Sequence, residues 1–147
     1  MTESVDIESG QPIAAEELRH LYASVGWVAY TADVDALAKA VANSTYVATA
    51  RSDGQLIGLA RGMSDNVSIF YLQDILVQPD WQHRGTGRAL LENCLERFHH
   101  VRQKVLLTDD DHAQHRFYEA MGYTDIGRIS RRPLHAFVKI AGLELEG

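Results

Sequence analysis

The sequence predicts a mixed α/β fold in which a central mixed β-sheet of about six or seven strands is flanked by about four helices. Three observations predict it. Apolar residues recur at helical spacing in both halves of the chain, and strand-like segments succeed one another over residues 45–77. A strand–helix–strand succession then covers residues 67–108, which is typical of two parallel strands joined by a crossover helix. The 147 residues suit a single domain, so we expect one domain over 1–147.

The first part of the chain predicts two helices. Residues 14–25 place Leu18, Leu21 and Tyr22 at the spacing of one helical face, and residues 34–41 repeat this pattern. The stretch GWVAYTAD between them is rich in aromatic residues and has no clear period. A first strand over residues 4–8 can precede these helices.

Strands follow in the middle of the chain. Residues 45–51 and 55–63 flank the tripeptide SDG, which predicts a β-hairpin. The segment VSIFYLQDILV, residues 67–77, is apolar nearly throughout, which indicates a central strand. It ends before Pro79, since proline has no N–H to donate to a sheet.

The second half predicts a helix over about 84–98, a short strand over 104–108 and a further helix that ends at Gly122. The segments TDIGRIS and LHAFVKI then predict two final strands.

The composition disfavours two classes of protein, those that bind nucleic acids and those that span a membrane. The net charge of −6 disfavours sequence-independent nucleic-acid binding, and no run approaches the ~18 apolar residues of a membrane span. The polar N-terminal stretch does not resemble a signal peptide, and Cys94 has no second cysteine to pair with. We therefore expect a soluble, cytoplasmic protein without nucleic-acid or membrane partners. No spacing of potential ligands indicates a metal site.

A turn that contains Gly85 and Gly87, called the glycine turn below, lies where the helix over 84–98 should begin. The N-terminus of a helix offers unpaired N–H groups and partial positive charge, and glycine lets a bound anion approach the backbone. We interpret the turn as a site for a phosphate or pyrophosphate, although a plain glycine-bearing loop would show the same spacing. The Walker A lysine is absent, and Leu90 occupies the third glycine position of a dinucleotide fingerprint. The residues expected at this anion site are Gln82, Arg84, Gly85, Thr86, Gly87 and Arg88.

The sequence around this turn resembles a known family. VQPDWQHRGTGRALL is similar to the acyl-CoA-binding signature of the GNAT-superfamily N-acetyltransferases, a strand that ends in Val-x-Pro followed by Gln/Arg-x-x-Gly-x-Gly/Ala. RFYEAMGY is similar to a second family motif, and the order of elements agrees over residues 14–140. The resemblance implies the acyl-CoA N-acyltransferase fold with acetyl-CoA as co-substrate and no metal.

The implied activity is transfer of the acetyl group of acetyl-CoA to a primary amine, by direct attack in a ternary complex. An alkylamine with a pKa of ~10.4 is almost entirely protonated at neutral pH, so its proton must be removed. The thiolate leaving group needs an acid, and Tyr118 matches the family's acid tyrosine. The alternative for Tyr118 is a packed aromatic on an amphipathic helix.

The resemblance also assigns the strand before the turn. Its end implies backbone contacts from Ile75, Leu76 and Val77 to the pantetheine arm and the thioester carbonyl. Asp111 stands where many members carry a cofactor-contacting asparagine, and it suits a helix N-cap equally.

Asp74 is a carboxylate in an otherwise apolar strand, so it needs a hydrogen-bond donor or a functional task. It can bind the substrate ammonium, relay its proton or serve a structural hydrogen bond. Gln73 is expected to bind the substrate together with Trp27 and Tyr30; it should point to the opposite face of a regular strand, and a bulge would change this. Trp27 and Tyr30 either form an aromatic wall of the acceptor pocket or belong to the core.

Three readings of the function stay open. A small-molecule amine is the acceptor that we expect, and a peptide or protein N-acetyltransferase is the second reading. A non-catalytic acyl-CoA-binding sensor is the third, and it has no need for the acid at Tyr118. A homodimer is consistent with the family, and the sequence decides neither this nor the acceptor.

Overall fold

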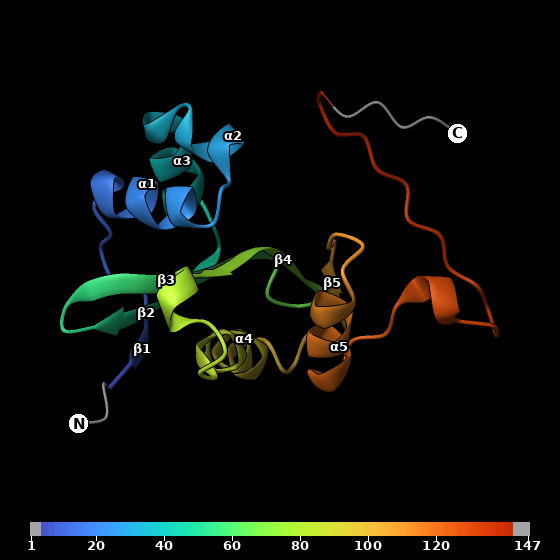
Figure 1. Cartoon of the computed structure of the whole chain (residues 1–147). Coiled ribbons are helices and arrows are strands. Elements are labelled where there is room, and N and C mark those ends of the chain that lie inside the picture. The colour runs from blue at the N-terminus through green and yellow to red at the C-terminus, as the bar shows by residue number, and fades with distance from the viewer. Residues whose placement is uncertain (1–3, 143–147) are drawn as a thin grey trace. The chain divides into compact units, whose positions relative to one another are not determined.

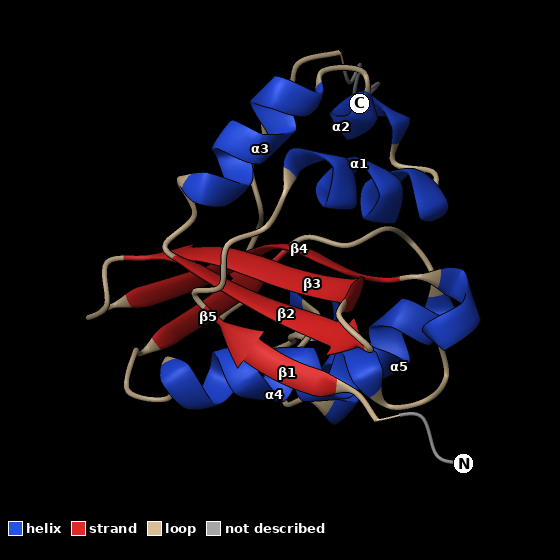
Figure 2. Cartoon of the chain, turned by 90° about the vertical axis from the view of Figure 1, so that its left-hand side faces the viewer, coloured by secondary structure: helices blue, strands red, loops and turns tan. Residues whose placement is uncertain are grey.

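The computed structural model describes residues 4–142, and the chain divides into two compact units, Met1–Leu107 and Thr108–Gly147 (Figure 1). The first unit contains a five-stranded sheet in the order β1-β2-β3-β4-β5. Helices α1, α2 and α3 lie over one face of this sheet, and α4 lies over the other (Figure 2). No helix within residues 4–142 is long and apolar enough to cross a membrane. The elements of the first unit are β1 (Asp6–Ser9), α1 (Ala15–Ser24), α2 (Val28–Thr31), α3 (Val34–Ala42), β2 (Tyr46–Ser52), β3 (Gln55–Ser64), β4 (Ile69–Val77), a 3₁₀ helix (Pro79–Trp81), α4 (Thr86–Arg97) and β5 (Gln103–Leu106).

The sheet is mixed, as predicted. Strands β1 to β4 pair antiparallel in sequence order, while β5 pairs parallel to β4 after the crossover through α4. The predicted hairpin is confirmed, because β2 and β3 join at a two-residue turn whose Asp53 and Gly54 have φ of 49° and 77°. Positive φ at both positions is the signature of the type I′ turn that suits hairpin twist. Strand β4 has a neighbour on each side, so the predicted central position is also confirmed.

The two predicted N-terminal helices are present as α1 and α3. Their apolar faces form one core cluster with β3 and β4, to which Leu18, Leu21, Leu37 and Val41 belong. The aromatic stretch between them contains α2, a single helical turn that the sequence pattern did not reveal because a period cannot be read from four residues.

The core under the other face is built around α4. Phe98, which follows this helix, stacks on Phe70 of β4 with ring centroids 4.5 Å apart. The helix approaches the sheet closely at Gly58, where an added Cβ would lie 3.1 Å from Leu90 and 3.2 Å from the Leu76 carbonyl. A glycine in β3 therefore sets how closely α4 packs.

The second unit contains α5 (His112–Ala120) and a 3₁₀ helix (Ile126–Arg128). Helix α5 ends as predicted before Gly122, whose φ is 95°. The prediction of two final strands is wrong for the described residues 124–142, which contain no strand, and the sheet has five strands rather than six or seven. The carboxylate of Asp125 accepts a hydrogen bond from the Gly127 N–H and closes a turn instead.

The segment LHAFVKI also has strand-like composition without being a strand. Leu134 and Phe137 are 60% and 94% exposed. Strand propensity reflects packing on a sheet, so alternating apolar residues do not make a strand without a neighbouring strand. Residues 4–142 contain five α-helices, one more than expected, because α2 was missed.

Candidate active site

A β-bulge in β4 decides which way its side chains point. Arg61 of β3 pairs with Asp74, and the next residue, Gly62, pairs with Leu72, so Gln73 is an extra residue on β4. Phe70 points toward α4, whereas Asp74 points toward α1 and α2. In a regular strand these two side chains, four residues apart, would share a face. The bulge therefore carries the carboxylate across the sheet to the face covered by α1–α3.

Asp74 is the centre of a buried network. Its Oδ2 accepts hydrogen bonds from Arg61 Nε at 2.6 Å and from the Tyr22 hydroxyl at 2.9 Å. Its Oδ1 accepts from the Tyr30 hydroxyl at 3.0 Å. Arg61 also donates to Ser44 Oγ at 3.2 Å. Asp74 and Arg61 are each only 4% exposed, so this is a desolvated ion pair with two added hydroxyl donors.

The network changes the titration of its members. Burial lowers the pKa of the Arg61 guanidinium, but the attraction of Asp74 outweighs it and the net pKa is raised. Burial, and then the negative charge of Asp74, raises the pKa of Tyr22 far above its ordinary value. Arg61 is therefore charged and Tyr22 neutral at any pH near neutrality.

Sequence reasoning missed Arg61 and Tyr22. A buried carboxylate needs a donor, and Arg61 is the cation opposite Asp74 in the β3–β4 register. The predicted strand QLIGLARGM shows this arginine among apolar residues, but its register against the next strand was not predicted. Tyr22 was assigned to the apolar face of α1, where it does lie, fully buried.

Trp27 and Tyr30 both lie beside this network. Their rings are 6.1 Å apart, and each packs edge-on against Tyr22, at 5.8 Å and 5.1 Å. Both are half-buried and pack against the core cluster. Gln73, which is exposed, donates from Nε2 to the Tyr30 hydroxyl at 3.4 Å. The structure thus brings together all three residues predicted to bind the acceptor, with Asp74 behind them.

Strand β4 separates from β5 just where this cluster begins. Their parallel pairing covers Ile69–Leu72 and Gln103–Leu106 and ends there. Beyond Leu72, β4 continues to Val77 with β3 as its paired neighbour among the described residues. The edge of β4 from Gln73 to Val77 therefore has backbone polar groups that the sheet does not use, and the predicted Ile75, Leu76 and Val77 lie on it.

The turn after β4 is tied back to this edge. The side chain of Gln82 donates from Nε2 to the Val77 carbonyl at 2.9 Å. Its predicted contact to an acyl-CoA is thus accompanied by a structural bond that holds the turn beside the end of β4. The 3₁₀ helix that begins at Pro79 covers the distance between them.

The predicted anion site lies at the N-terminus of α4. Gly85 is the N-cap with φ of 84°, and nothing lies within 4 Å of where its Cβ would be. Glycine is therefore required there by backbone conformation and not by crowding. Thr86 is 5% exposed, while Arg84 and Arg88 are exposed. The predicted residues from Gln82 to Arg88 thus surround one helix N-terminus.

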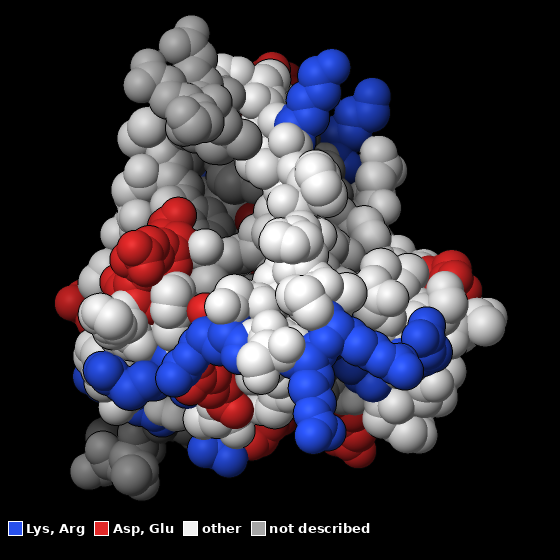
Figure 3. Space-filling view, turned by 90° about the vertical axis from the view of Figure 1, so that its right-hand side faces the viewer, with Lys and Arg blue, Asp and Glu red and all other residues white. Residues whose placement is uncertain are grey.

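The basic groups of the turn have partners in the protein. Arg84 lies over the ring of Trp81 at 4.9 Å, and Arg88 pairs with Glu92 at 2.8 Å in an exposed ion pair. Figure 3 shows basic and acidic side chains on the same face of the protein.

The second unit holds the two remaining predicted residues. Tyr118 lies on α5 between Phe117 and Tyr123, with ring centroids 5.2 Å and 6.0 Å away, and burial raises its pKa to about 12. The carboxylate of Asp111 caps α5 by accepting from the N–H groups of Ala113 and Gln114. Asp111 therefore fills the capping role that the sequence left open, and its contact to a cofactor stays a prediction.

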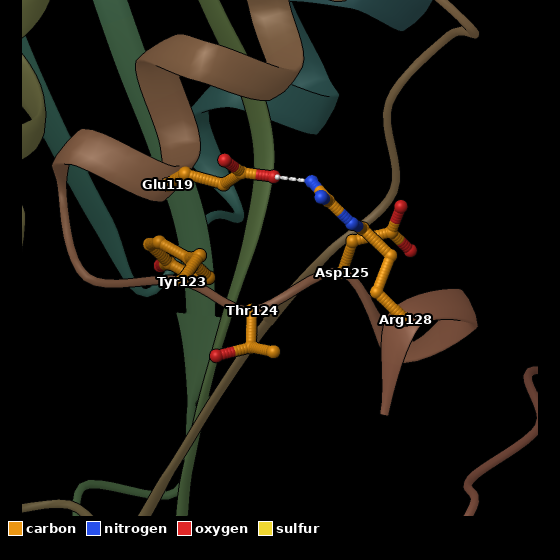
Figure 4. Close-up of a pocket in the computed structure, with 5 residues that line it drawn as sticks. All are labelled: Glu119, Tyr123, Thr124, Asp125 and Arg128. Carbon is orange, nitrogen blue, oxygen red and sulfur yellow. Dashed lines mark hydrogen bonds and ion pairs between the residues drawn. The ribbon is translucent and has the colours of Figure 1, made fainter. Parts of the chain in front are cut away.

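The second unit also has a surface pocket of about 230 Å³. An ion pair of 3.0 Å joins two of its lining residues, Glu119 and Arg128 (Figure 4). No residue predicted for the active site lines it. Its lining residues are Glu119, Tyr123, Thr124, Asp125 and Arg128. Within residues 4–142, no group of three or more His, Cys, Asp or Glu side chains is placed to hold a metal ion.

The chain is similar to known acetyltransferases both in sequence and in fold. The chain is 32% identical over 104 residues to histone acetyltransferase TAP1 of Glycine max, a match that covers 63% of this chain and 44% of that protein. The chain thus spans less than half the length of this curated relative. A GNAT-family acetyltransferase from Streptococcus pneumoniae TIGR4 has the same fold, with a TM-score of 0.79 at 24% identity over 95% of this chain and all of that one.

An aminoglycoside N-acetyltransferase in complex with CoA also shares the fold, with a TM-score of 0.65 at 16% identity, over 97% of this chain and 98% of that one. The family of the acetyltransferase (GNAT) domain matches residues 26–139, which include the β4 edge and the glycine turn. The chain therefore belongs to the GNAT family of acetyltransferases.

Proposed function

We propose that this acetyltransferase is a single domain that transfers the acetyl group of acetyl-CoA to the primary amine of a small molecule. The observation that carries the proposal is the free edge of β4 beyond Leu72, which is followed, after the 3₁₀ helix Pro79–Trp81, by the glycine turn at the start of α4. The related fold that was solved with CoA supports the choice of co-substrate.

The residues present fit acetyl-CoA, which supplies an activated acetyl group as a thioester. The left-handed Gly85 opens a helix N-terminus whose N–H groups suit the pyrophosphate, and Arg84, Thr86, Gly87 and Arg88 surround it. The backbone of Ile75, Leu76 and Val77 is assigned to the pantetheine arm, and one of its N–H groups to the thioester carbonyl. Gln82 holds the turn against Val77. Asp111 is assigned a cofactor contact secondary to its cap.

Tyr118 is proposed as the acid at the sulfur. With a pKa near 12 it is fully protonated at neutral pH. A thiolate of pKa about 8.5 is a weaker base than the tyrosinate, so complete transfer of the Tyr118 proton to it is uphill. Tyr118 therefore acts as a hydrogen-bond donor that stabilises the developing thiolate, and the final proton comes from the amine.

The acceptor side of the site is assigned to Trp27, Tyr30, Gln73 and Asp74, which the first unit clusters beside the free edge of β4. Trp27 and Tyr30 offer apolar ring surface to the body of the amine. Compact amines with an apolar body fit this surface better than long polar chains. A cytoplasmic location is part of the proposal.

A second function, peptide or protein N-acetylation, is favoured by one finding, the similarity to a histone acetyltransferase. A lysine side chain is also a primary amine on an apolar stem, so the same cluster can accept it. The two functions differ in what surrounds the amine.

The test is acetyl-CoA-dependent thiol release by the purified protein against a panel of amines. The panel contains arylalkylamines, polyamines, amino sugars, amino acids and short lysine peptides. Release with a small amine supports the proposal, and release with lysine peptides alone moves the function to peptides. Tight acetyl-CoA binding without release from any amine would indicate a sensor. No binding at all would overturn the assignment of the glycine turn.

A further inference from the structure

We propose that Asp74 is a positioning group, and that the Tyr30 hydroxyl oxygen which it orients is the atom that accepts a hydrogen bond from the acceptor amine. The inference rests on the proposed function, because it assigns a role on the acceptor side of that site. It is carried by the geometry of a small set of side chains from α2 and β4: Tyr30, Gln73 and Asp74.

Asp74 is not placed to bind the amine itself. It is 4% exposed, and three protein donors already occupy its two oxygens. A carboxylate has about four lone-pair positions, so little acceptor capacity is left. An amine that bound here directly would displace a tyrosine hydroxyl or the Arg61 guanidinium and leave a buried polar group unpaired.

Tyr30 has the acceptor capacity that Asp74 lacks. A phenol carries one proton, and that of Tyr30 is donated to Asp74 Oδ1 at 3.0 Å. Toward every other neighbour its oxygen is an acceptor only, and the bond to a carboxylate strengthens this acceptor. Tyr30 thus selects a group that donates, such as the N–H of an amine.

The acceptor position of Tyr30 is open to an incoming group. Its present donor, Gln73 Nε2, is 3.4 Å away, beyond the usual range of 2.7–3.2 Å for a strong bond. Gln73 is exposed and Tyr30 half-buried, so this weak bond lies at the surface. An amine can replace or share it without breaking the buried network.

Arg61 sets the net charge of the network. Arg61 cancels the charge of Asp74, so Tyr30 offers an oriented acceptor without a net negative charge behind it. Such a site holds an amine by hydrogen bonding and favours its neutral, nucleophilic form more than a full counter-charge would. With Trp27 beside it, the site fits a single primary amine on an apolar or aromatic body. It does not fit a polycation, such as an amino sugar with several ammonium groups.

The test compares three tyrosine-to-phenylalanine variants, each of which removes one hydroxyl, and its probe amine is the arylalkylamine of the panel that gives the fastest thiol release with the unaltered protein. Tyr30→Phe should lower kcat/KM for the amine by roughly 10- to 100-fold and leave KM for acetyl-CoA unchanged, as expected for loss of a hydrogen bond to the amine. Tyr22→Phe should change kcat/KM for the amine less than about threefold, because Tyr22 is fully buried and Arg61 still holds Oδ2 of Asp74. Tyr46→Phe is the matched control, since its hydroxyl binds Asn93 of α4 on the other face of the sheet. It should change neither parameter.

A second readout does not depend on turnover. Calorimetry of the amine binding to the protein without acetyl-CoA should show Tyr30→Phe weakened by a similar factor and Tyr46→Phe unchanged. A Tyr30→Phe variant that binds and turns over the amine as Tyr46→Phe does would overturn the proposal. Equal losses for the amine and for acetyl-CoA would also overturn it, because they would indicate a general disturbance of the fold.

The role of Asp74 is tested in the Tyr30→Phe background. If Asp74 acts through Tyr30, Asp74→Asn added to Tyr30→Phe should lower kcat/KM no further in protein that thermal denaturation shows to be folded. A further loss of 100-fold or more would assign Asp74 a direct role as base and refute the proposal. Failure of the proposed function is seen separately, as absence of amine-dependent thiol release by the unaltered protein.

Discussion

The buried pair of Arg61 and Asp74 predicts a large and specific stability effect. Replacing Asp74 by Asn removes the negative charge 2.6 Å from Arg61 Nε, at a site where both residues are 4% exposed. Breaking a buried ion pair by removing one partner costs about 3–5 kcal/mol, because the other charge is left uncompensated. A domain of this size has a total stability of about 5–15 kcal/mol. The variant should therefore lose about a fifth or more of its free energy of unfolding.

The assay is equilibrium unfolding in urea, followed by circular dichroism and by tryptophan fluorescence. Arg61→Met should destabilise by a similar amount, and the double variant by clearly less than the sum, because it leaves no unpaired charge. Glu92→Gln is the matched control, since it breaks an ion pair with Arg88 that is exposed on both sides, and it should cost less than about 0.5 kcal/mol. A loss below about 1 kcal/mol for Asp74→Asn would refute the reasoning.

Three further predictions follow from the turn, the acid and the cysteine. Gly85→Glu should weaken acetyl-CoA binding in calorimetry at least tenfold more than Gly85→Ala, because both strain a φ of 84° but only the first adds negative charge at the helix N-terminus; equal losses would contradict an anion site. Tyr118→Phe should lower kcat by roughly 10²- to 10³-fold with KM for acetyl-CoA retained, because it removes the donor that stabilises the developing thiolate, and full kcat in steady-state kinetics would remove this role. Burial raises the pKa of the fully buried Cys94 thiol from 9.0 to about 12. The unfolded chain therefore loses this proton first, and stability falls as pH rises between about 9 and 12, by up to about 1.4 kcal/mol per pH unit in urea titrations. Cys94→Ala should lack this part of the alkaline loss, and an identical slope would contradict it.

Local patterns accounted for much of the first unit. Helical spacing located α1 and α3, SDG located the β2–β3 turn, and Pro79 marked the end of β4. These features depend on residues close in sequence, so their physical causes can be read without the fold. Strand composition failed over residues 124–142, because a strand forms only with a neighbour to pair with.

The local sequence pattern could not predict to which face of the sheet the side chains of β4 point. Alternation alone would have placed Asp74 on the same face as Phe70, and a single bulge at Gln73 reversed this. A bulge arises from how two strands register against each other, so neither strand's sequence shows where it occurs. The same register placed Arg61 opposite Asp74 and created the network.

By itself, the sequence determined the mixed α/β class, the glycine turn before α4 and the family. Each of these depends on residues that lie in one element or in neighbouring elements of the chain. Only the tertiary structure decided what Asp74 does. Its three partners, Tyr22, Tyr30 and Arg61, are 52, 44 and 13 residues away along the chain and meet it only when α1, α2 and β3 pack around β4. A buried charge takes its role from such partners, since desolvation requires that they exist but nothing in the local sequence says which residues they are.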